Sequence, residues 1–369
     1  MIEFGYLNHK AGCAEMKSIM FMIPSMIRGG AERVVSILAN DYASRGWKVS
    51  ILMLLHSHIG YELDKSIDVI DISDDSKSVA LMYPFLIRRV RKTVNAVRPD
   101  IIVSFMANTC LISGPACRHS DARFVVSERI DPTQDKRNII VRSMLNSIYS
   151  RSDCCIMQTK RAFDYFPEKV KEKSVIIPNP VNVSAVATGG SRRIVASGRL
   201  DAQKNHRLLI KAFSDLHGQF DGWCLDIYGE GPERGDLESL IRELGLSDYV
   251  SLKGNVSDLH QQMADAGLYV LSSDFEGLSN ALIEAMMMGL PCISTDCAGS
   301  DEIITDKQDG IIVPVGDEKA LTEAMRLLMS DRDLALSFGR KARISSERFR
   351  TDVVIERWRA AIEGDPNVS

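Results

Sequence analysis

The amino-acid sequence predicts an α/β protein made of two doubly wound domains, each a parallel sheet with helices on both faces. Short β-branched segments alternate with helical patterns along the chain, which is typical of parallel strands joined by crossover helices. The length of 369 residues exceeds what one hydrophobic core usually supports. A Pro-, Ala-, Thr-, Ser- and Gly-rich stretch interrupts the pattern near residues 179–191. We therefore assign residues 1–185 to the first domain and 186–349 to the second.

The individual elements follow from this alternation. In the first domain, strands are predicted at residues 18–23, 48–54, 67–72, 100–105, 123–127, 154–158 and 174–177. In the second, they are predicted at residues 193–197, 223–228, 250–253, 268–271, 291–294 and 310–313. Helices are expected at residues 31–45, 138–150, 318–329, 334–349 and 352–362. The second sheet does not need the last helix, so residues 350–369 are expected to cross back onto the first domain. Residues 1–15 are predicted to be a tail.

Charge is divided unevenly between the two predicted domains. Residues 1–185 carry a net charge of +6 and the remainder −10. Basic residues are densest at positions 88–92, within a helical apolar pattern formed by Leu81, Phe85, Leu86, Val90, Val94 and Val97. A basic amphipathic helix can lie on an anionic membrane surface, and a solvated helix face explains the same pattern. Nucleic acid is not an expected partner, because the cluster lacks interleaved aromatic residues and a recognisable binding module.

The sequence predicts a cytoplasmic protein that can also lie at the inner face of the cell membrane. No apolar run approaches the ~20 residues of a membrane span, and no signal peptide is recognisable. The eight cysteines include no Cys-x-x-Cys pattern. We therefore interpret them as buried thiols rather than as metal ligands or redox pairs.

The most informative segment is residues 274–284, where Glu276 and Glu284 flank a Gly-Leu-Ser-Asn turn that opens an apolar segment. Acidic side chains beside free backbone N–H groups at a helix N-terminus suit a ligand that is both polyhydroxylated and phosphorylated. A nucleotide sugar is such a ligand. Two carboxylates would also fit the acid and nucleophile of a glycoside hydrolase, but a hydrolase does not need phosphate-binding groups around them.

Glycine-rich turns follow several predicted strands. Gly29 and Gly30 begin the first long helix, where paired glycines let backbone approach a ligand and the helix N-terminus favours an anion. The pattern matches neither Gly-x-Gly-x-x-Gly nor a Walker loop, which disfavours nicotinamide and ATP. After the first strand of the second domain, Arg199 and Lys204 could hold a diphosphate. Taken singly, each of these features is equally a tight turn or a solvated charge.

Taken together and in this order, the motifs resemble those of the retaining glycosyltransferases of family 4. That family has the GT-B fold, in which two Rossmann-like domains face each other across a cleft. The resemblance covers nearly the whole chain. It rests on Gly-Gly-Ala-Glu-Arg at 29–33, Gly-Arg-Leu at 198–200 with Lys204, Gly-Glu-Gly-Pro at 229–232, residues 276–285, Gly-Leu-Pro at 289–291 and Gly-Ile-Ile-Val at 310–313.

The resemblance implies a site for a nucleoside-diphosphate sugar. In it, Glu276 binds the sugar hydroxyls, Glu284 binds the ribose hydroxyls, and Arg199 with Lys204 neutralises the departing diphosphate. The other donor-binding residues that it implies are Gly29, Gly30, Gly254, Asn255, Val256, Gly277, Leu278, Ser279 and Asn280. Fixed cations at the phosphate lower the barrier to transfer. We expect neither a cofactor nor a metal, because no Asp-x-Asp type of pair is placed to hold one and residues 74–75 lie in a polar loop.

One position departs from the family pattern. Many relatives carry a His in the segment that corresponds to residues 126–132, and this chain has Arg129 there. Arginine stays protonated and cannot act as a general base. Arg129 could instead stabilise the donor phosphate or orient the acceptor, in contact with Glu128 or Asp131. A loop ion pair with one of these carboxylates explains the residue equally well.

The sequence thus predicts a retaining, metal-independent enzyme that moves a hexose or N-acetylhexosamine, carried by UDP, to a glycan acceptor. By analogy with the family, the acceptor would be lipid-linked and the pathway bacterial surface-polysaccharide assembly. A sugar phosphorylase or sucrose-synthase-like enzyme shares the fold, but such chains are usually much longer. A non-catalytic nucleotide-sugar-binding protein would keep Arg199, Lys204 and Glu284 without needing Glu276.

Overall fold

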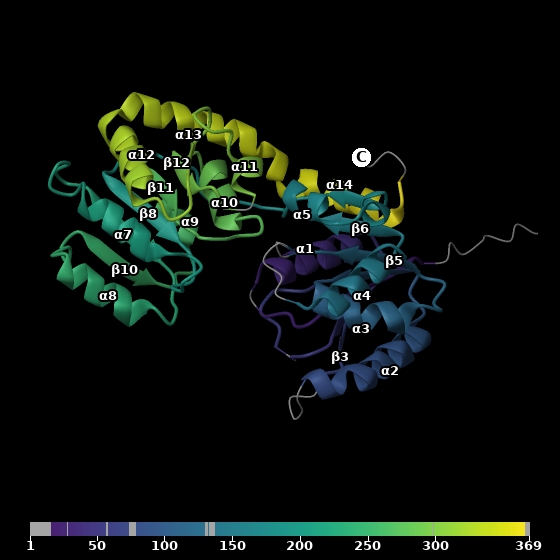
Figure 1. Cartoon of the computed structure of the whole chain (residues 1–369). Helices are drawn as coiled ribbons and strands as arrows, with labels where there is room; N and C mark the ends of the chain where they lie inside the picture. The colour runs from purple at the N-terminus through teal and green to yellow at the C-terminus, as the bar shows by residue number, and fades with distance from the viewer. Residues whose placement is uncertain are drawn as a thin grey trace, which may run out of the picture. The chain divides into compact units, whose positions relative to one another are not determined.

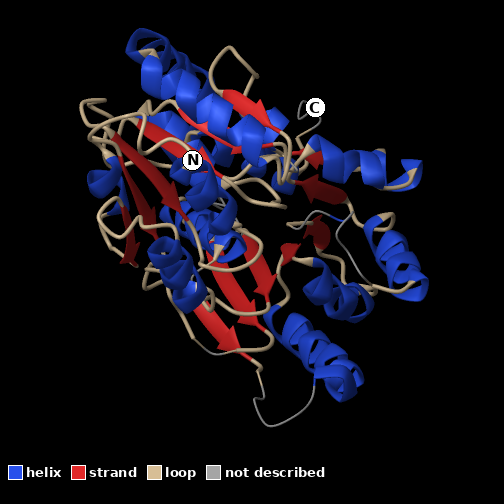
Figure 2. Ribbon diagram, turned by 60° about the vertical axis from the view of Figure 1, so that its left-hand side comes forward, coloured by secondary structure: helices blue, strands red, loops and turns tan. Residues whose placement is uncertain are grey.

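The computed structural model describes residues 16–27, 29–56, 58–73, 79–129, 132, 137–297 and 299–365. The predicted tail of residues 1–15, the Asp74 and Asp75 pair, and Asp131 lie outside the described residues. The chain divides into two compact units. The first comprises residues 1–104 and 112–124, and the second comprises residues 105–111 and 125–369. Helices flank the strands of each sheet (Figures 1 and 2).

The first sheet has seven strands in the order β3-β2-β1-β4-β5-β6-β7. These are β1 (Ser18–Ile23), β2 (Lys48–Met53), β3 (Asp68–Asp71), β4 (Ile101–Phe105), β5 (Arg123–Ser127), β6 (Cys154–Met157) and β7 (Ser174–Ile176). The pairings of β1 with β2 and β4, of β2 with β3, and of β6 with β5 and β7 are parallel. The chain builds outward from β1 to β3 and then continues on the other side of β1, which creates a topological switch point between β1 and β4.

The second sheet has six strands in the order β10-β9-β8-β11-β12-β13, and its pairings are parallel. These are β8 (Arg193–Ser197), β9 (Cys224–Tyr228), β10 (Val250–Gly254), β11 (Leu268–Leu271), β12 (Cys292–Thr295) and β13 (Ile311–Val313). Its switch point lies between β8 and β11. Ligands of such sheets bind beyond the carboxyl ends of the strands at this point.

Within the described residues, all thirteen predicted strands are present, and each boundary agrees with the structure to within one residue. The prediction is easiest for central strands such as β4 and β11, which are buried along their whole length and largely apolar. Along β8, Ile194 and Ala196 enter one core cluster while Val195 enters another. This alternation is the period-two geometry of a strand buried on both sides.

The described helices occupy the connections between strands. They are α1 (Gly30–Ser44), α2 (Val79–Val97), α3 (Ala107–Cys117), α4 (Ile139–Tyr149), α5 (Lys160–Tyr165), α6 (Glu168–Lys171), α7 (His206–Ser214), α8 (Arg234–Glu243), α9 (Leu259–Met263), α10 (Asn280–Met288), α11 (Ser300–Ile303), α12 (Glu318–Ser330), α13 (Arg332–Ser346), η2 (Glu347–Phe349) and α14 (Thr351–Glu363). The fold class predicted from the sequence, two parallel-sheet Rossmann-like domains, is confirmed.

The last helix, α14, lies against strands of the first sheet. Trp358 is fully buried and stacks on Phe105, at the end of β4, with ring centroids 5.6 Å apart. The Arg357 guanidinium donates a hydrogen bond to the carbonyl of Ile176 in β7 (2.6 Å). A polar contact and an aromatic stack therefore join the end of the chain to this sheet. The domain boundaries at residues 185 and 349 themselves stay a prediction.

The basic helix predicted around residue 88 is α2, and one detail of its pattern was wrong. Leu86, Val90 and Val94 are buried as expected, but Phe85 is 48% exposed. Arg89 covers the Phe85 ring at 5.4 Å from its centroid. The apolar stripe of α2 is therefore narrower than the sequence suggests, and an aromatic side chain lies among the basic ones.

The described cysteines are Cys110, Cys117, Cys154, Cys155, Cys224, Cys292 and Cys297, and all are free thiols. All are buried except Cys224, which is half-buried. Burial raises the pKa of the Cys155 thiol to about 12, so this group stays protonated at neutral pH. Among the described helices, none is long and apolar enough to cross a membrane.

Candidate functional site

Lys204 and Glu276 meet at the switch point of the second sheet. Lys204 follows β8 and Glu276 follows β11, the two strands on either side of that point (Figure 1). The Lys204 Nζ lies 2.5 Å from Glu276 Oε1, and the side chains are only 17% and 10% exposed. Ser273 Oγ donates a second hydrogen bond to the same carboxylate oxygen (2.7 Å). The sequence predicted both charged residues, but not that they form a nearly buried ion pair.

Hydrogen bonds connect the loop after β8 to the loop after β11. Ser272 Oγ donates to the carbonyl of Lys204 (3.0 Å), and the Asn205 amide donates to Asp274 (2.8 Å). Asn205 also caps α7 from a left-handed conformation, with its side chain accepting from the amide of Leu208. These contacts fix the backbone of Lys204. Its side chain therefore approaches Glu276 from a rigid loop.

Close approach of backbone segments shapes the turn before Lys204. Gly198 has φ +155°, and a Cβ there would lie 3.0 Å from the Lys204 stem. A Cβ on Gly229, which has φ +143°, would lie 1.9 Å from the carbonyl oxygen of Gly198. A larger residue at position 229 would displace the loop that carries Arg199. Gly198 and Gly229, which belong to two of the sequence motifs, thus let the turns after β8 and β9 pack closely.

The N-terminus of α10 presents unused backbone donors. Ser279 caps the helix by accepting a hydrogen bond from the amide of Leu282. In the part of the chain that the structure describes, the amides of Gly277, Leu278, Ser279 and Asn280 have no hydrogen-bond acceptor. Helix N-termini with free amides favour phosphate and carboxylate groups. This end of α10 is suited to an anionic ligand.

Glu284, one turn further along α10, faces His260 of α9. Their Nε2 and Oε2 atoms are 3.3 Å apart, and Glu284 is 12% exposed. The other ring nitrogen of His260 lies 3.2 Å from both the backbone N and the Oγ of Ser184. The carboxylate is therefore oriented by a residue that sequence reasoning missed. Both predicted carboxylates contact basic side chains, an arrangement that does not suit the free acid and nucleophile of a hydrolase.

One cavity of about 500 Å³ is lined by seven of the predicted site residues, but not by Glu276. Among its lining residues are Arg199, Lys204, Gly254, Asn255, Val256, Asn280 and Glu284. Arg199 is 69% exposed and pairs with Asp201 at 2.5 Å. Gly277, Leu278 and Ser279 belong to the adjoining loop but do not line this cavity. Gly29 and Gly30 lie in the other unit, where the Tyr61 hydroxyl donates a hydrogen bond to the carbonyl of Gly29 (2.8 Å).

Arg129 is buried and lies outside this cavity. Desolvation lowers the pKa of its guanidinium to about 10, while Glu128 opposes the shift. The guanidinium donates to the side-chain oxygen of Asn179 and lies 5.6 Å from the Trp358 ring centroid. Glu128 accepts instead from the backbone amide of Arg129 (3.0 Å) and from the Tyr149 hydroxyl (2.8 Å). Among the described residues, Arg129 Nε and Nη1 have no hydrogen-bond partner.

Asn179 links Arg129 to the donor cavity. Its Nδ2 donates to Oδ1 of Asn280 at 2.6 Å, while its oxygen accepts from Arg129. The sequence marked Asn179 only as the start of an irregular stretch, and it did not single out Ser273 or His260. A buried amide before a proline, at the end of a strand, is the signal that would have indicated a fixed polar contact at Asn179. No local signal distinguishes His260 from other helix-surface residues.

Comparisons with known proteins agree with this architecture. Residues 28–185 match the model of Glycosyltransferase Family 4, and residues 184–345 match that of Glycosyl transferases group 1. The chain is 25% identical to an uncharacterised glycosyltransferase of Haemophilus influenzae, over 94% of this chain and 100% of the relative.

Two named proteins extend the comparison. The chain is 26% identical to N-acetylgalactosamine-N,N'-diacetylbacillosaminyl-diphospho-undecaprenol 4-alpha-N-acetylgalactosaminyltransferase of Campylobacter jejuni, over 90% of this chain and 96% of that enzyme. Its fold is similar to that of HepE from Anabaena, solved with UDP, with a TM-score of 0.79 and 17% identity over 94% and 100% of the two chains.

The fold and the two consecutive family matches define a GT-B glycosyltransferase. The chain belongs to the glycosyltransferases that combine an N-terminal Family 4 domain with a C-terminal group 1 domain. The family predicted from the sequence motifs is confirmed.

Proposed function

We propose that this glycosyltransferase transfers a hexose or N-acetylhexosamine from a UDP-sugar to a lipid-linked glycan in bacterial surface-polysaccharide assembly. The observation that carries the proposal is the cavity lined by Lys204, Arg199, Glu284 and Asn280, whose backbone amide at the start of α10 has no acceptor in the described part of the chain. These groups match the charges and hydroxyls of a nucleoside-diphosphate sugar. The Campylobacter relative, whose name specifies a diphospho-undecaprenol acceptor, supports the acceptor class.

In the proposed reaction, the anomeric carbon loses its bond to the diphosphate and gains one to the acceptor hydroxyl. Negative charge develops on the departing diphosphate, where Lys204, Arg199 and the α10 amides stabilise it. Glu276 holds sugar hydroxyls and Glu284 the ribose. We propose retention of configuration, with a donor phosphate oxygen taking the acceptor's proton. Arg129 stays protonated and orients the donor or acceptor through Asn179.

The decisive experiment incubates the full chain with UDP-N-acetylgalactosamine, UDP-N-acetylglucosamine, UDP-glucose and GDP-mannose. Release of nucleoside diphosphate is followed with and without a polyprenyl-diphosphate-linked sugar acceptor, and the linkage of the product is read by NMR. We expect acceptor-dependent release from one UDP-sugar and an α-linked product from an α-linked donor. Donor binding without release under every condition would instead indicate the non-catalytic binding protein.

We also propose that turnover needs no metal ion. Two fixed cations and a helix N-terminus can neutralise the leaving group by themselves. Turnover is expected to persist in excess EDTA. Loss of activity on chelation that Mg²⁺ or Mn²⁺ restores would contradict this proposal.

We further propose that α2 brings the enzyme to an anionic membrane surface. Arg88 and Lys92 are exposed on this helix, and exposed Phe85 offers an apolar contact between lipid headgroups. Flotation with phosphatidylglycerol vesicles should fall in Arg88→Gln/Lys92→Gln but not in Lys65→Gln/Arg118→Gln, which makes the same charge change elsewhere in this unit. Equal flotation of both variants, or none by the wild type, would refute docking through α2.

A further inference from the structure

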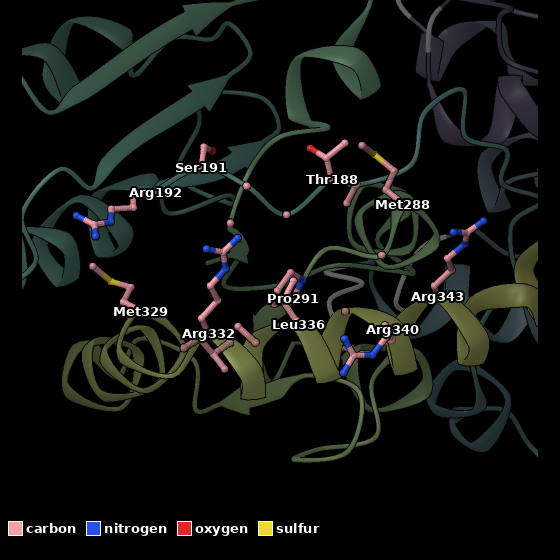
Figure 3. A pocket seen from close by; sticks show the side chains of 18 of the residues that line it. Thr188, Ser191, Arg192, Met288, Pro291, Met329, Arg332, Leu336, Arg340 and Arg343 are labelled. Atoms are coloured by element: carbon pink, nitrogen blue, oxygen red, sulfur yellow. The ribbon is translucent and has the colours of Figure 1, made fainter.

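Figure 3 shows a second cavity, of about 340 Å³. Met288 and Gly289 at the C-terminal end of α10 line it, whereas Asn280 at the N-terminal end lines the donor cavity. The segment before β8, the C-terminus of α10 and one face of α13 form the walls of the second cavity. Four of the lining side chains are arginines: Arg192, Arg332, Arg340 and Arg343. None of its described lining residues is acidic.

This concentration of positive charge runs against its surroundings. Residues 186–369 have a net charge of −10, so cations gathered here are not a consequence of composition. In the described ranges, the guanidinium groups of Arg332, Arg340 and Arg343 donate no hydrogen bond and form no ion pair. Like charges around one cavity repel each other unless a counter-charge is present. All four arginines are exposed, so water solvates them, and none of the described lining residues is a carboxylate that would compete with an anion for them.

Arg332 occupies a position that helix stability disfavours, whereas Arg343 lies in the last turn of α13, where the helix dipole favours a cation. Arg332 is the first residue of α13, where the helix dipole disfavours a cation. A Cβ placed on Gly289, the C-cap residue of α10, would lie 3.8 Å from the Cβ and Cδ atoms of Arg343. A Cβ on Gly339 would lie only 2.2 Å from the Gly289 carbonyl oxygen, so glycine permits α13 to pack this closely. Close packing fixes the Arg343 backbone at the cavity wall.

Backbone donors and apolar walls complete the site. Gly189 and Gly190 line the cavity, and their amides have no acceptor in the described part of the chain. Guanidinium forks and free amides are the donors that bind phosphate oxygens. Trp223, Met288 and Leu336 supply apolar lining. In Figure 3, Arg332 lies between Arg192 and Arg343, so charge is distributed across the cavity rather than gathered at one corner.

We propose that this cavity is a second binding site, separate from the donor cavity, for a ligand with phosphate or diphosphate groups attached to a compact apolar moiety. Its volume falls within the usual range of small-molecule sites, about 300–1,000 Å³. The ligand is either a soluble phosphate ester or the diphosphate end of an isoprenoid lipid. The inference rests on the arginine cavity alone and does not depend on the proposed transfer reaction.

The test isolates this cavity by removing cations from the other one. In an Arg199→Gln/Lys204→Met background, titration calorimetry is performed with inorganic diphosphate and with farnesyl diphosphate. Adding Arg332→Gln/Arg343→Gln should weaken binding at least ~10-fold, which corresponds to about 1.4 kcal/mol, because two charge-assisted contacts to the phosphate groups are lost. Adding Lys319→Gln/Lys341→Gln, the same charge change on α12 and α13 outside the cavity, should leave binding unchanged.

The two probes separate the two ligand sources. Binding of farnesyl diphosphate ~10-fold or more tighter than inorganic diphosphate would assign the site to an isoprenoid carrier, and equal affinities would assign it to a soluble phosphate ester. No measurable binding of either probe in the Arg199→Gln/Lys204→Met background would overturn the proposal. Equal affinities of the arginine and lysine variants would overturn it too, provided that both unfold at the wild-type temperature.

Discussion

Glu276→Gln is expected to lower sugar transfer while leaving UDP binding unchanged or tighter. The reason is the ion pair between Lys204 Nζ and Glu276 Oε1. At their separation of 2.5 Å, with an effective dielectric constant of about 20, the Coulomb attraction is about 6–7 kcal/mol. Desolvation of the two groups offsets most of this, leaving a net coupling of about 1–3 kcal/mol. A diphosphate that binds Lys204 must draw it away from this carboxylate.

The substitution therefore has opposite effects on the two steps. The glutamine side chain would keep the shape of Glu276 and the hydrogen bond from Ser273 but release Lys204, so UDP should bind between equally and ~10-fold more tightly. Turnover should fall ~100-fold or more, because a charged hydrogen bond to the sugar is lost where the transition state needs it. Lys204→Met is the counterpart and should weaken UDP binding ~10- to 100-fold.

Calorimetric titration with UDP and a steady-state assay of UDP release measure the two effects on the same preparation. Ser273→Ala serves as the control, because it removes a neutral hydrogen bond to Glu276 but leaves the ion pair intact. UDP binding more than ~5-fold weaker in Glu276→Gln would refute the competition for Lys204. Unchanged turnover in that variant would refute the assignment of Glu276 to the sugar.

Three other predictions concern the support of the site. Gly229→Ala should weaken UDP binding and lower the thermal unfolding midpoint, because the new Cβ would lie 1.9 Å from the Gly198 carbonyl oxygen. The control is Gly235→Ala in α8, where a Cβ would have no atom within 4 Å, and it should leave UDP binding unchanged. Asn179→Ala should lower turnover without changing UDP affinity, since it breaks the link between Arg129 and Asn280. An equal loss of turnover and of UDP affinity would contradict this role of Asn179. Burial lowers the pKa of His206 to about 4, against about 6.5 unfolded, so stability should be constant above pH 6.5 and fall by up to about 3 kcal/mol as the pH drops toward 4. His206→Leu should remove that dependence, and an unchanged pH profile of its thermal midpoint would contradict it.

The central strands, such as β4 and β11, could be predicted because burial on both faces makes their sequences largely apolar. Local chemistry also located the start of α10, where Ser279 is a strong capping residue. Phe85 shows where such reasoning fails. Its spacing fits the apolar face of α2, but the ring is 48% exposed beneath Arg89. Long basic side chains cover apolar groups in this way, and the periodicity of a sequence does not reveal such contacts.

The sequence could not predict which partners the charged side chains contact. Lys204 and Glu276 are 72 positions apart, and only the strand order brings the loops after β8 and β11 together. Arg129 was expected to contact a neighbouring carboxylate, yet its guanidinium donates to Asn179, 50 positions away. The carboxylate of Glu128 accepts instead from the Tyr149 hydroxyl and the Arg129 amide. Such choices depend on tertiary packing that no local pattern encodes.

The ion pairs at the donor site also affect how the enzyme would distinguish a UDP-sugar from the product UDP. Lys204 contacts Glu276, Arg199 contacts Asp201, and His260 contacts Glu284, so Lys204 and Arg199 are already paired with carboxylates before a ligand arrives. UDP alone would take Lys204 and leave the nearly buried Glu276 without its cation, which is costly. The hydroxyls of a UDP-sugar would give that carboxylate new donors. A UDP-sugar should therefore bind more tightly than UDP, and the difference should shrink in Glu276→Gln, since the neutral side chain no longer needs a replacement partner.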